Sequence, residues 1–196
     1  TIDGYNPYRI MRDGIDWECP EPNDPWSYIG YWGDHQIIYL QKLLEVSNNF
    51  HPGKIDNLLT TEIFTYANVP YRIKSYNEII KNPKDTVVFD EELNNQIKTE
   101  AAHLGADASL LKNKSGEKIY KVNLTEKILV TLLSKLSNFI PEAGIWLNTQ
   151  RPEWNDANNA LVGNGTSMVT LYYLRRFLKF WEDKFGSIST NKIRIS

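Results

Sequence analysis

The chain contains 196 residues, carries a formal net charge of −2 at pH 7, and is 41% hydrophobic. This length suits one domain, since domains cluster near about 100–150 residues, and the hydrophobic content exceeds that of a disordered chain. No basic surplus is present to neutralise phosphates, so we expect no nucleic-acid partner. No apolar run approaches the roughly 18–20 residues that span a bilayer, so we expect no membrane partner either.

Cysteine and histidine are scarce. Cys19 alone forms neither an intrachain disulfide nor a CxxC motif, and the three histidines are far apart in the sequence. We therefore expect no metal site. The sequence leaves the compartment open, although it slightly favours the cytoplasm.

Residues 1–33 form a first segment that is rich in proline, glycine and aromatic residues. Prolines alternate with other residues between Cys19 and Pro25, which excludes a helix interior there. The many aromatic rings predict an ordered loop that packs against another part of the protein.

From residue 34 onward the hydrophobic spacing is typical of helices. Asp34 is a suitable N-cap for a helix that runs to about Val46, and Asn123 and Glu126 have the spacing of a capping box. The further helices that we expect cover 54–67, 76–81, 91–104, 124–139 and 167–185, the last with a wide apolar arc. The brief β-branched stretch 86–89 is ambiguous. These features predict an all-α fold of antiparallel helical hairpins over 34–196, within a single helical domain.

A long segment between the last two helices contains the strongest candidate site. Glu153 and Asp156 stand three residues apart beside Trp154. Carboxylates next to an indole suit sugar recognition, and an indole also raises the pKa of a neighbouring carboxyl by desolvation, as a general acid requires. The alternative is that Asp156 only caps a short helix and Trp154 belongs to the core.

Two further clusters are candidates. Trp32, Asp34 and His35 adjoin the start of the first helix, where Asp34 is either only a cap or also a ligand. The stretch from Arg12 to Glu18 alternates acids around Trp17, and it either lines a cleft or forms a surface turn.

The stretch from Glu153 to Asn159 resembles the Asp-Trp-Asn-Asp-Gly-x-Asn signature of the cellobiose phosphorylase family, whose catalytic domains are (α/α)6 toroids. The stretch from Gly33 to Leu40 is similar to that family's Asp-Asp-His-Leu-Trp-Leu block. Both blocks occur in the family's order, with Asp34 and Asp156 122 positions apart. The chain departs from the family at Gly33, Glu153 and Ala157, and it also resembles an internal part of large bacterial proteins of this superfamily.

The resemblance implies a segment of an (α/α)6 toroid that cleaves a glycosidic bond with inversion. Asp156 would be the general acid, and the expected sugar-binding residues are Trp32, Asp34, His35, Glu153 and Trp154. The expected substrate is an oligosaccharide or disaccharide, with inorganic phosphate as co-substrate if the enzyme is a phosphorylase and with no other cofactor. Half a toroid need not be active alone, and its open side predicts pairing with the remaining barrel helices or self-association.

Two other interpretations stay open. In the first, a non-catalytic helical module binds a glycan or a protein through its aromatic loops, and Trp17, Trp26 and Trp32 form an exposed platform. In the second, the loops only fill a core, so the tryptophans are buried and no cleft exists.

Overall fold

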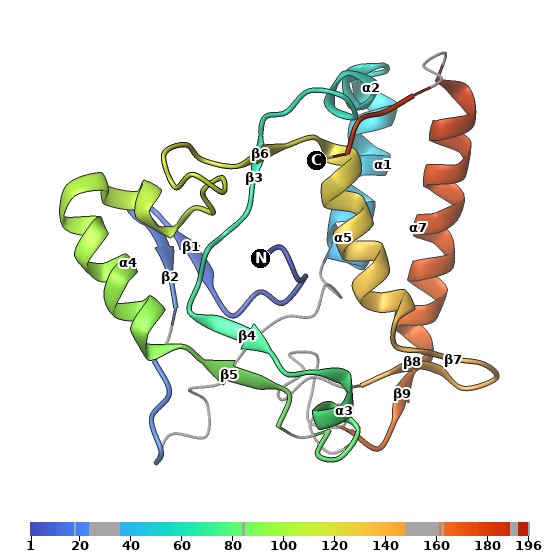
Figure 1. Ribbon diagram of the computed structural model, residues 1–196. Coiled ribbons are helices and arrows are strands. Elements are labelled where there is room, and N and C mark those ends of the chain that lie inside the picture. Colours follow the sequence, from blue (N-terminus) through green and yellow to red (C-terminus); the bar gives the residue numbers. More distant parts are fainter. Residues whose placement is uncertain are drawn as a thin grey trace. The chain divides into compact units, whose positions relative to one another are not determined.

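The computed structural model describes residues 1–17, 19–23, 36–83, 85–147, 161, 163–188 and 192–195 (Figure 1). The chain forms two compact units, each assembled from three separate stretches. Unit 1 comprises Thr1–Trp32, Thr65–Tyr120 and Trp146–Gly165. Unit 2 comprises Gly33–Phe64, Lys121–Ile145 and Thr166–Ser196.

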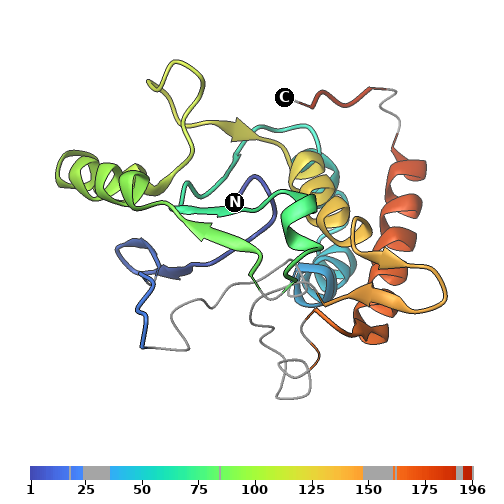
Figure 2. The ribbon, with the colours of Figure 1, turned by 60° about the horizontal axis from the view of Figure 1, so that its bottom comes forward.

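Unit 1 combines two small antiparallel sheets with two helices and a 3₁₀ segment. Strand β1 (Arg9–Met11) pairs with β2 (Gly14–Asp16) in a hairpin, with Arg9 opposite Asp16. Strand β4 (Tyr71–Ile73) pairs with β5 (Val87–Phe89), as Figure 2 shows. The helical elements are α3 (Tyr76–Ile79), α4 (Glu91–Leu104) and the 3₁₀ segment η2 (Gly105–Ser109).

Aromatic packing gives unit 1 its core. Tyr5, Tyr71 and Val87 are buried together, and Trp17 and Phe89 pack against them. The rings of Tyr71 and Phe89 meet edge to face, with their centroids 5.2 Å apart. The aromatic N-terminal segment thus packs on another part of the protein, as its composition predicts.

Unit 2 is mainly helical. Its helical elements are the π-helix η1 (Gln36–Leu40), α1 (Gln41–Phe50), α2 (Lys54–Leu58), α5 (Leu124–Leu136) and α7 (Met168–Ser187). Helices α1, α5 and α7 lie side by side in Figures 1 and 2, and η1 contacts both α5 and α7. Large side chains that are fully buried here include Ile37, Ile55, Leu59, Leu174 and Phe177.

The remaining strands are short. Strand β3 (Phe64–Thr65) pairs with β6 (Lys121–Val122). Strand β8 (Gly144–Trp146) lies between β7 (Phe139–Ile140) and β9 (Thr166–Ser167) in a three-stranded sheet.

The predicted all-α class is therefore wrong. The described chain is mixed: 47% of it is helical and 17% is strand, and it contains six α-helices and four small antiparallel sheets. The expectation of antiparallel helical hairpins from an (α/α)6 toroid belongs to that class and is wrong with it. Each strand has only two or three residues, which is too short to produce a recognisable alternation of apolar and polar residues.

The helix boundaries follow the hydrophobic spacing except in the first helix and after α2. The first helix, predicted to end at about Val46, is π-helical over η1 and continues as α1 to Phe50. Helix α4 has the predicted bounds, and Asn123 caps α5 by accepting a hydrogen bond from the Glu126 amide. The helix expected over 54–67 ends at Leu58, and the chain continues into strand β3. No helix among the described residues has the length and apolarity needed to cross a bilayer.

Candidate functional site

The six residues that the sequence nominates lie outside the described residues. They are Trp32, Asp34, His35, Glu153, Trp154 and Asp156. The structure therefore neither brings them together nor separates them. What it does describe is the backbone on either side of each predicted block.

The segment 148–162 contains Glu153, Trp154 and Asp156, and the residues at its two ends are hydrogen-bonded to each other. The Gly163 amide donates to the Leu147 carbonyl at 2.6 Å, and the Leu147 amide donates to the Gly165 carbonyl at 3.0 Å. The indole Nε1 of Trp146 donates to the Gly163 carbonyl at 3.2 Å. Leu147 itself is buried. The base of this segment is therefore closed by three hydrogen bonds.

Gly163 permits this closure. Its φ of +77° lies in the left-handed region, where only glycine is free of strain. A Cβ atom at Gly163 would lie only 2.8 Å from Cγ of Pro83. Glycine is thus required here both by the backbone conformation and by the close neighbour.

The block that contains Asp34 and His35 directly precedes η1. Ile37 and Ile38 of η1 are buried, which fixes this π-helix in unit 2. The side-chain oxygens of Gln36 and Gln41 are buried, and the described part of the chain provides no hydrogen-bond partner for either. Such orphaned acceptors cost free energy, and π-helices often mark functional sites.

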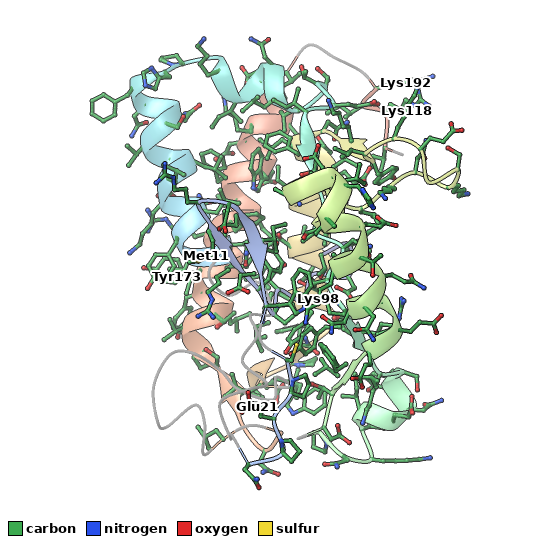
Figure 3. All side chains as sticks on the ribbon, turned by 90° about the vertical axis from the view of Figure 1, so that its left-hand side faces the viewer. Met11, Glu21, Lys98, Lys118, Tyr173 and Lys192 are labelled. Carbon is green, nitrogen blue, oxygen red and sulfur yellow. The ribbon has the colours of Figure 1, made fainter. Side chains whose placement is uncertain are left out.

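A groove of about 340 Å³ lies in unit 1 beside the β1–β2 hairpin and α4. Its lining includes Asp13, Asp16, Trp17 and Lys98. The stretch around Trp17 forms the β1–β2 hairpin with an exposed turn at Arg12 and Asp13, as the surface-turn alternative predicts. Asp13–Trp17 also lines the groove, while Glu18 lies outside the described residues. Figure 3 views this region, with Met11 labelled on the hairpin and Lys98 on α4.

The Trp17 ring is fixed by a residue that sequence reasoning missed. Its Nε1 donates to Oδ1 of Asn94 at 3.0 Å, and Asn94 is buried on α4. The sequence instead predicts Leu93, Ile97, Ala101 and Leu104 as the buried face, of which only Ile97 is fully buried. The sequence signal that could have identified Asn94 is its spacing of three residues from Ile97, which places both side chains on the same face of the helix.

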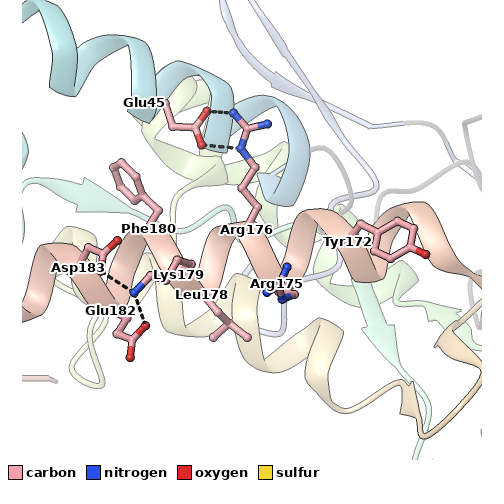
Figure 4. Close-up of a pocket in the computed structure, with 9 residues that line it drawn as sticks. All are labelled: Glu45, Tyr172, Arg175, Arg176, Leu178, Lys179, Phe180, Glu182 and Asp183. Atoms are coloured by element: carbon pink, nitrogen blue, oxygen red, sulfur yellow. Dashed lines mark hydrogen bonds and ion pairs between the residues drawn. The ribbon is translucent and has the colours of Figure 1, made fainter.

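A wider groove of about 950 Å³ runs along α7 and includes Glu45 of α1 (Figure 4). Apart from Arg175, its charged side chains pair with one another. Arg176 binds Glu45 with two hydrogen bonds, and Lys179 lies 3.0 Å from Glu182 and 2.8 Å from Asp183. The hydrogen bond from Arg176 lowers the pKa of the Glu45 carboxyl. The paired charges satisfy each other, which leaves the exposed Arg175 as the charged side chain that the described part of the groove offers to a ligand.

A third hollow of about 540 Å³ includes Cys19, Lys74 and Asp85. Lys74 and Asp85 form an ion pair of 2.5 Å, and the Lys98 ammonium lies 3.7 Å from the exposed Cys19 thiol. No cluster of three or more metal-ligating side chains occurs among the described residues.

Comparison with known proteins adds no relative, because no family model and no curated protein sequence matches this chain. Function is therefore inferred from the residues and the local geometry.

Proposed function

We propose that the protein cleaves a glycosidic bond with inversion and that Asp156 is the general acid. Trp32, Asp34, His35, Glu153 and Trp154 bind the sugar in this proposal. The substrate is an oligosaccharide or disaccharide, attacked by water or by inorganic phosphate. The proposal does not depend on a toroidal fold.

The observation that carries this proposal is the closed base of segment 148–162. The segment contains the Trp-Asn-Asp motif, and hydrogen bonds around Leu147 hold its two ends together. Catalytic residues are disproportionately found on connecting segments that a rigid scaffold positions. Trp154 precedes Asp156 by two residues in the sequence, and an indole that packs on a carboxyl favours the protonated acid that donates to a leaving oxygen.

The two forms of the reaction make different demands on the site. An inverting hydrolase needs a second carboxylate about 6.5–9.5 Å from the acid, which leaves room for a water molecule. A phosphorylase needs a phosphate site in place of that base. Asp34 is the acid that we nominate for the hydrolase.

The test compares wild type with Asp156→Asn in the protein expressed from its full reading frame. Substrates are α- and β-linked glucose disaccharides and the matching 4-nitrophenyl glucosides, with and without phosphate. We expect kcat on the disaccharides to fall by about 10²–10⁴, because the leaving sugar needs a proton. The loss on nitrophenyl substrates should be smaller, since nitrophenolate leaves without protonation.

Asp107→Asn is the matched control, since Asp107 is an exposed acid on η2 outside the predicted site. This control should retain wild-type turnover. Equal turnover by wild type and Asp156→Asn would remove Asp156 from the mechanism.

The alternative function is non-catalytic binding of a glycan or protein through the aromatic loops. The groove beside Trp17 favours it, because Trp17 lies in the N-terminal aromatic segment and lines that groove. Trp17 is half-buried and hydrogen-bonded, so it does not form a free platform, and Trp26 and Trp32 lie outside the described residues. Absence of turnover on every substrate, with saccharide binding retained, would favour this function over catalysis.

A further inference from the structure

The groove in unit 1 is built by close packing of the β1–β2 hairpin on η2. Gly14 makes this approach feasible, because a Cβ atom there would lie 3.0 Å from Cβ of Ala106. Ile97 and Ser109 are buried along the same groove. Its volume of about 340 Å³ lies within the range of small-molecule sites, which is about 300–1,000 Å³.

Trp17, whose side chain is half-buried, is one of the residues that line the groove. The ring packs on the Tyr5, Tyr71 and Val87 cluster, and its Nε1 hydrogen bond to Asn94 fixes its orientation. An aromatic ring fixed in this way provides a flat apolar surface at little entropic cost, since its side chain is already ordered before a ligand binds.

The charges around the groove cancel. Asp13 and Asp16 contribute two negative charges, while Lys98 contributes one positive charge. Arg9 supplies the other, since its Nε lies 3.0 Å from Oδ2 of Asp16. A cation would be attracted to the tryptophan and the acids but repelled by Lys98 and Arg9. An anion would be attracted to Lys98 and Arg9 but repelled by the two acids. The ligand that suits this balance is neutral and polar.

We propose that this groove is a binding site for a neutral saccharide. The apolar face of a pyranose stacks on Trp17, Asp13 accepts hydrogen bonds from its hydroxyl groups, and the Lys98 ammonium donates to a hydroxyl or ring oxygen. Asn94 is a positioning residue that acts through Trp17. The choice of a saccharide rests in part on the proposed function, but binding here requires no contribution from Asp156.

Isothermal titration calorimetry tests this site with methyl β-glucoside, cellobiose and maltose as probes. Choline and inorganic phosphate serve as charged comparison ligands. We expect at least one neutral probe to bind more tightly than both charged ligands. We also expect Asp13→Asn to weaken that binding by about tenfold, because the amide replaces a charged acceptor. Asp107→Asn, in the same unit but outside the groove lining, should bind as wild type does.

A second measurement follows Trp17 directly in the wild-type protein. The indole Nε1–H signal of Trp17 in a ¹⁵N spectrum, assigned from its loss in Trp17→Phe, should shift when the saccharide is added. The shift should persist in Asp156→Asn even if that variant has lost turnover, which separates this site from the catalytic proposal. Absence of binding in wild type, unchanged affinity in Asp13→Asn, or tighter binding of choline would each overturn the proposal.

Discussion

Asn94 and Asn123 are buried polar side chains that each join distant parts of one unit. Asn123 accepts a hydrogen bond from the Glu126 amide at 3.0 Å and donates one to the Arg194 carbonyl at 2.7 Å. The first bond is predictable from sequence, because it lies within one helical turn. The bond to Arg194, like that of Asn94 to Trp17, depends on a tertiary approach that local spacing does not encode.

Lys127 of α5 gives the stability of the protein a specific pH dependence. Burial lowers the pKa of its ammonium from 10.5 to about 8, against the opposing attraction of the Glu126 carboxylate. Between about pH 8 and 10.5 the unfolded chain therefore binds more protons at this residue than the folded chain does. The free energy of unfolding consequently rises with pH through this window, and the burial penalty is largest below it.

Substitution Lys127→Met should remove this penalty. We expect the variant to be more stable than wild type at pH 7 by on the order of 1–2 kcal/mol, less than the full pKa change implies because the side chain remains partly solvated. The difference should shrink as pH rises from 8 toward 10.5. Urea unfolding at several pH values measures it, and subtracting the two profiles cancels other groups such as Tyr8, whose pKa burial raises.

Lys118→Met is the control, since Lys118 is an exposed lysine in a loop. Its stability should follow wild type at every pH. A Lys127→Met variant that is less stable at pH 7, or whose difference from wild type grows with pH, would contradict the assignment.

In helices α5 and α7, tertiary packing determines which face is buried, because the spacing of their apolar residues is compatible with several buried faces. The sequence places Lys135 and Asn138 on a solvated face of the helix expected over 124–139, yet both are buried, while Leu133 and Leu136 are exposed. Asn138 satisfies its amide locally by donating to the Ser134 carbonyl at 2.9 Å. In α7, burial is confined to the stripe Thr170, Leu174, Phe177 and Trp181 rather than to most sides.

The closed base of segment 148–162 can be tested by adding one methyl group. Gly163→Ala places a Cβ against the rigid Pro83 ring at a positive φ. Gly53→Ala is a matched control, because Gly53 has a similar φ of +80° but no atom within 4 Å of the added Cβ. Both variants incur the backbone strain, so their difference reports the steric conflict alone.

We expect Gly163→Ala to be less stable than Gly53→Ala by about 1–3 kcal/mol, which is the usual cost of overpacking. Thermal unfolding of the two variants measures the difference. If the segment contains the catalytic acid, Gly163→Ala should also lose turnover under conditions where it remains folded. Equal stability of the two variants would show that Pro83 shifts to accommodate the added Cβ without a cost in stability.

Across the whole chain, helices of ten or more residues were predictable and the strands were not. Helix α4 has 14 residues and its predicted bounds, because its cap Asp90 and its periodic apolar residues are local features. Strands β3 and β6 pair although they are far apart in the sequence, so their pairing depends on the fold rather than on local sequence. The hairpin strands β1 and β2 are close in sequence but only three residues long, which is too short for a recognisable pattern. This is why an all-α class followed from the sequence and a mixed class is observed.

For the candidate site too, some residues could be predicted from the local sequence and others could not. The stretch from Asp13 to Trp17 could be recognised from its residue types, and it lines a groove. Its partners on α4, Asn94 and Lys98, are about 80 residues away and have no local signature. Asp34 and Asp156, which the resemblance nominates, lie outside the described residues and remain predictions.

An exposed apolar stripe in unit 2 allows a prediction about the oligomeric state of the protein. Tyr39, Leu43, Val46 and Phe50 follow each other at spacings of four, three and four residues on η1 and α1. They are 55%, 63%, 53% and 77% exposed, respectively. This spacing is that of a seam between paired helices, and contiguous apolar surface of this kind marks interaction sites.

We therefore expect the chain to self-associate through this stripe, with two copies of α1 packed against each other. Light scattering should give a mass above 22.7 kDa that rises with protein concentration. The double substitution Leu43→Glu and Val46→Glu should return the mass to that of a monomer without unfolding the protein. Both side chains are exposed, and the new charges would repel each other across the seam.

Ile10→Glu is the control, since Ile10 is 80% exposed but lies on β1, so it should leave association unchanged. A monomeric wild type at high concentration, or equal loss of association in the control, would contradict the assignment of this stripe as the contact surface.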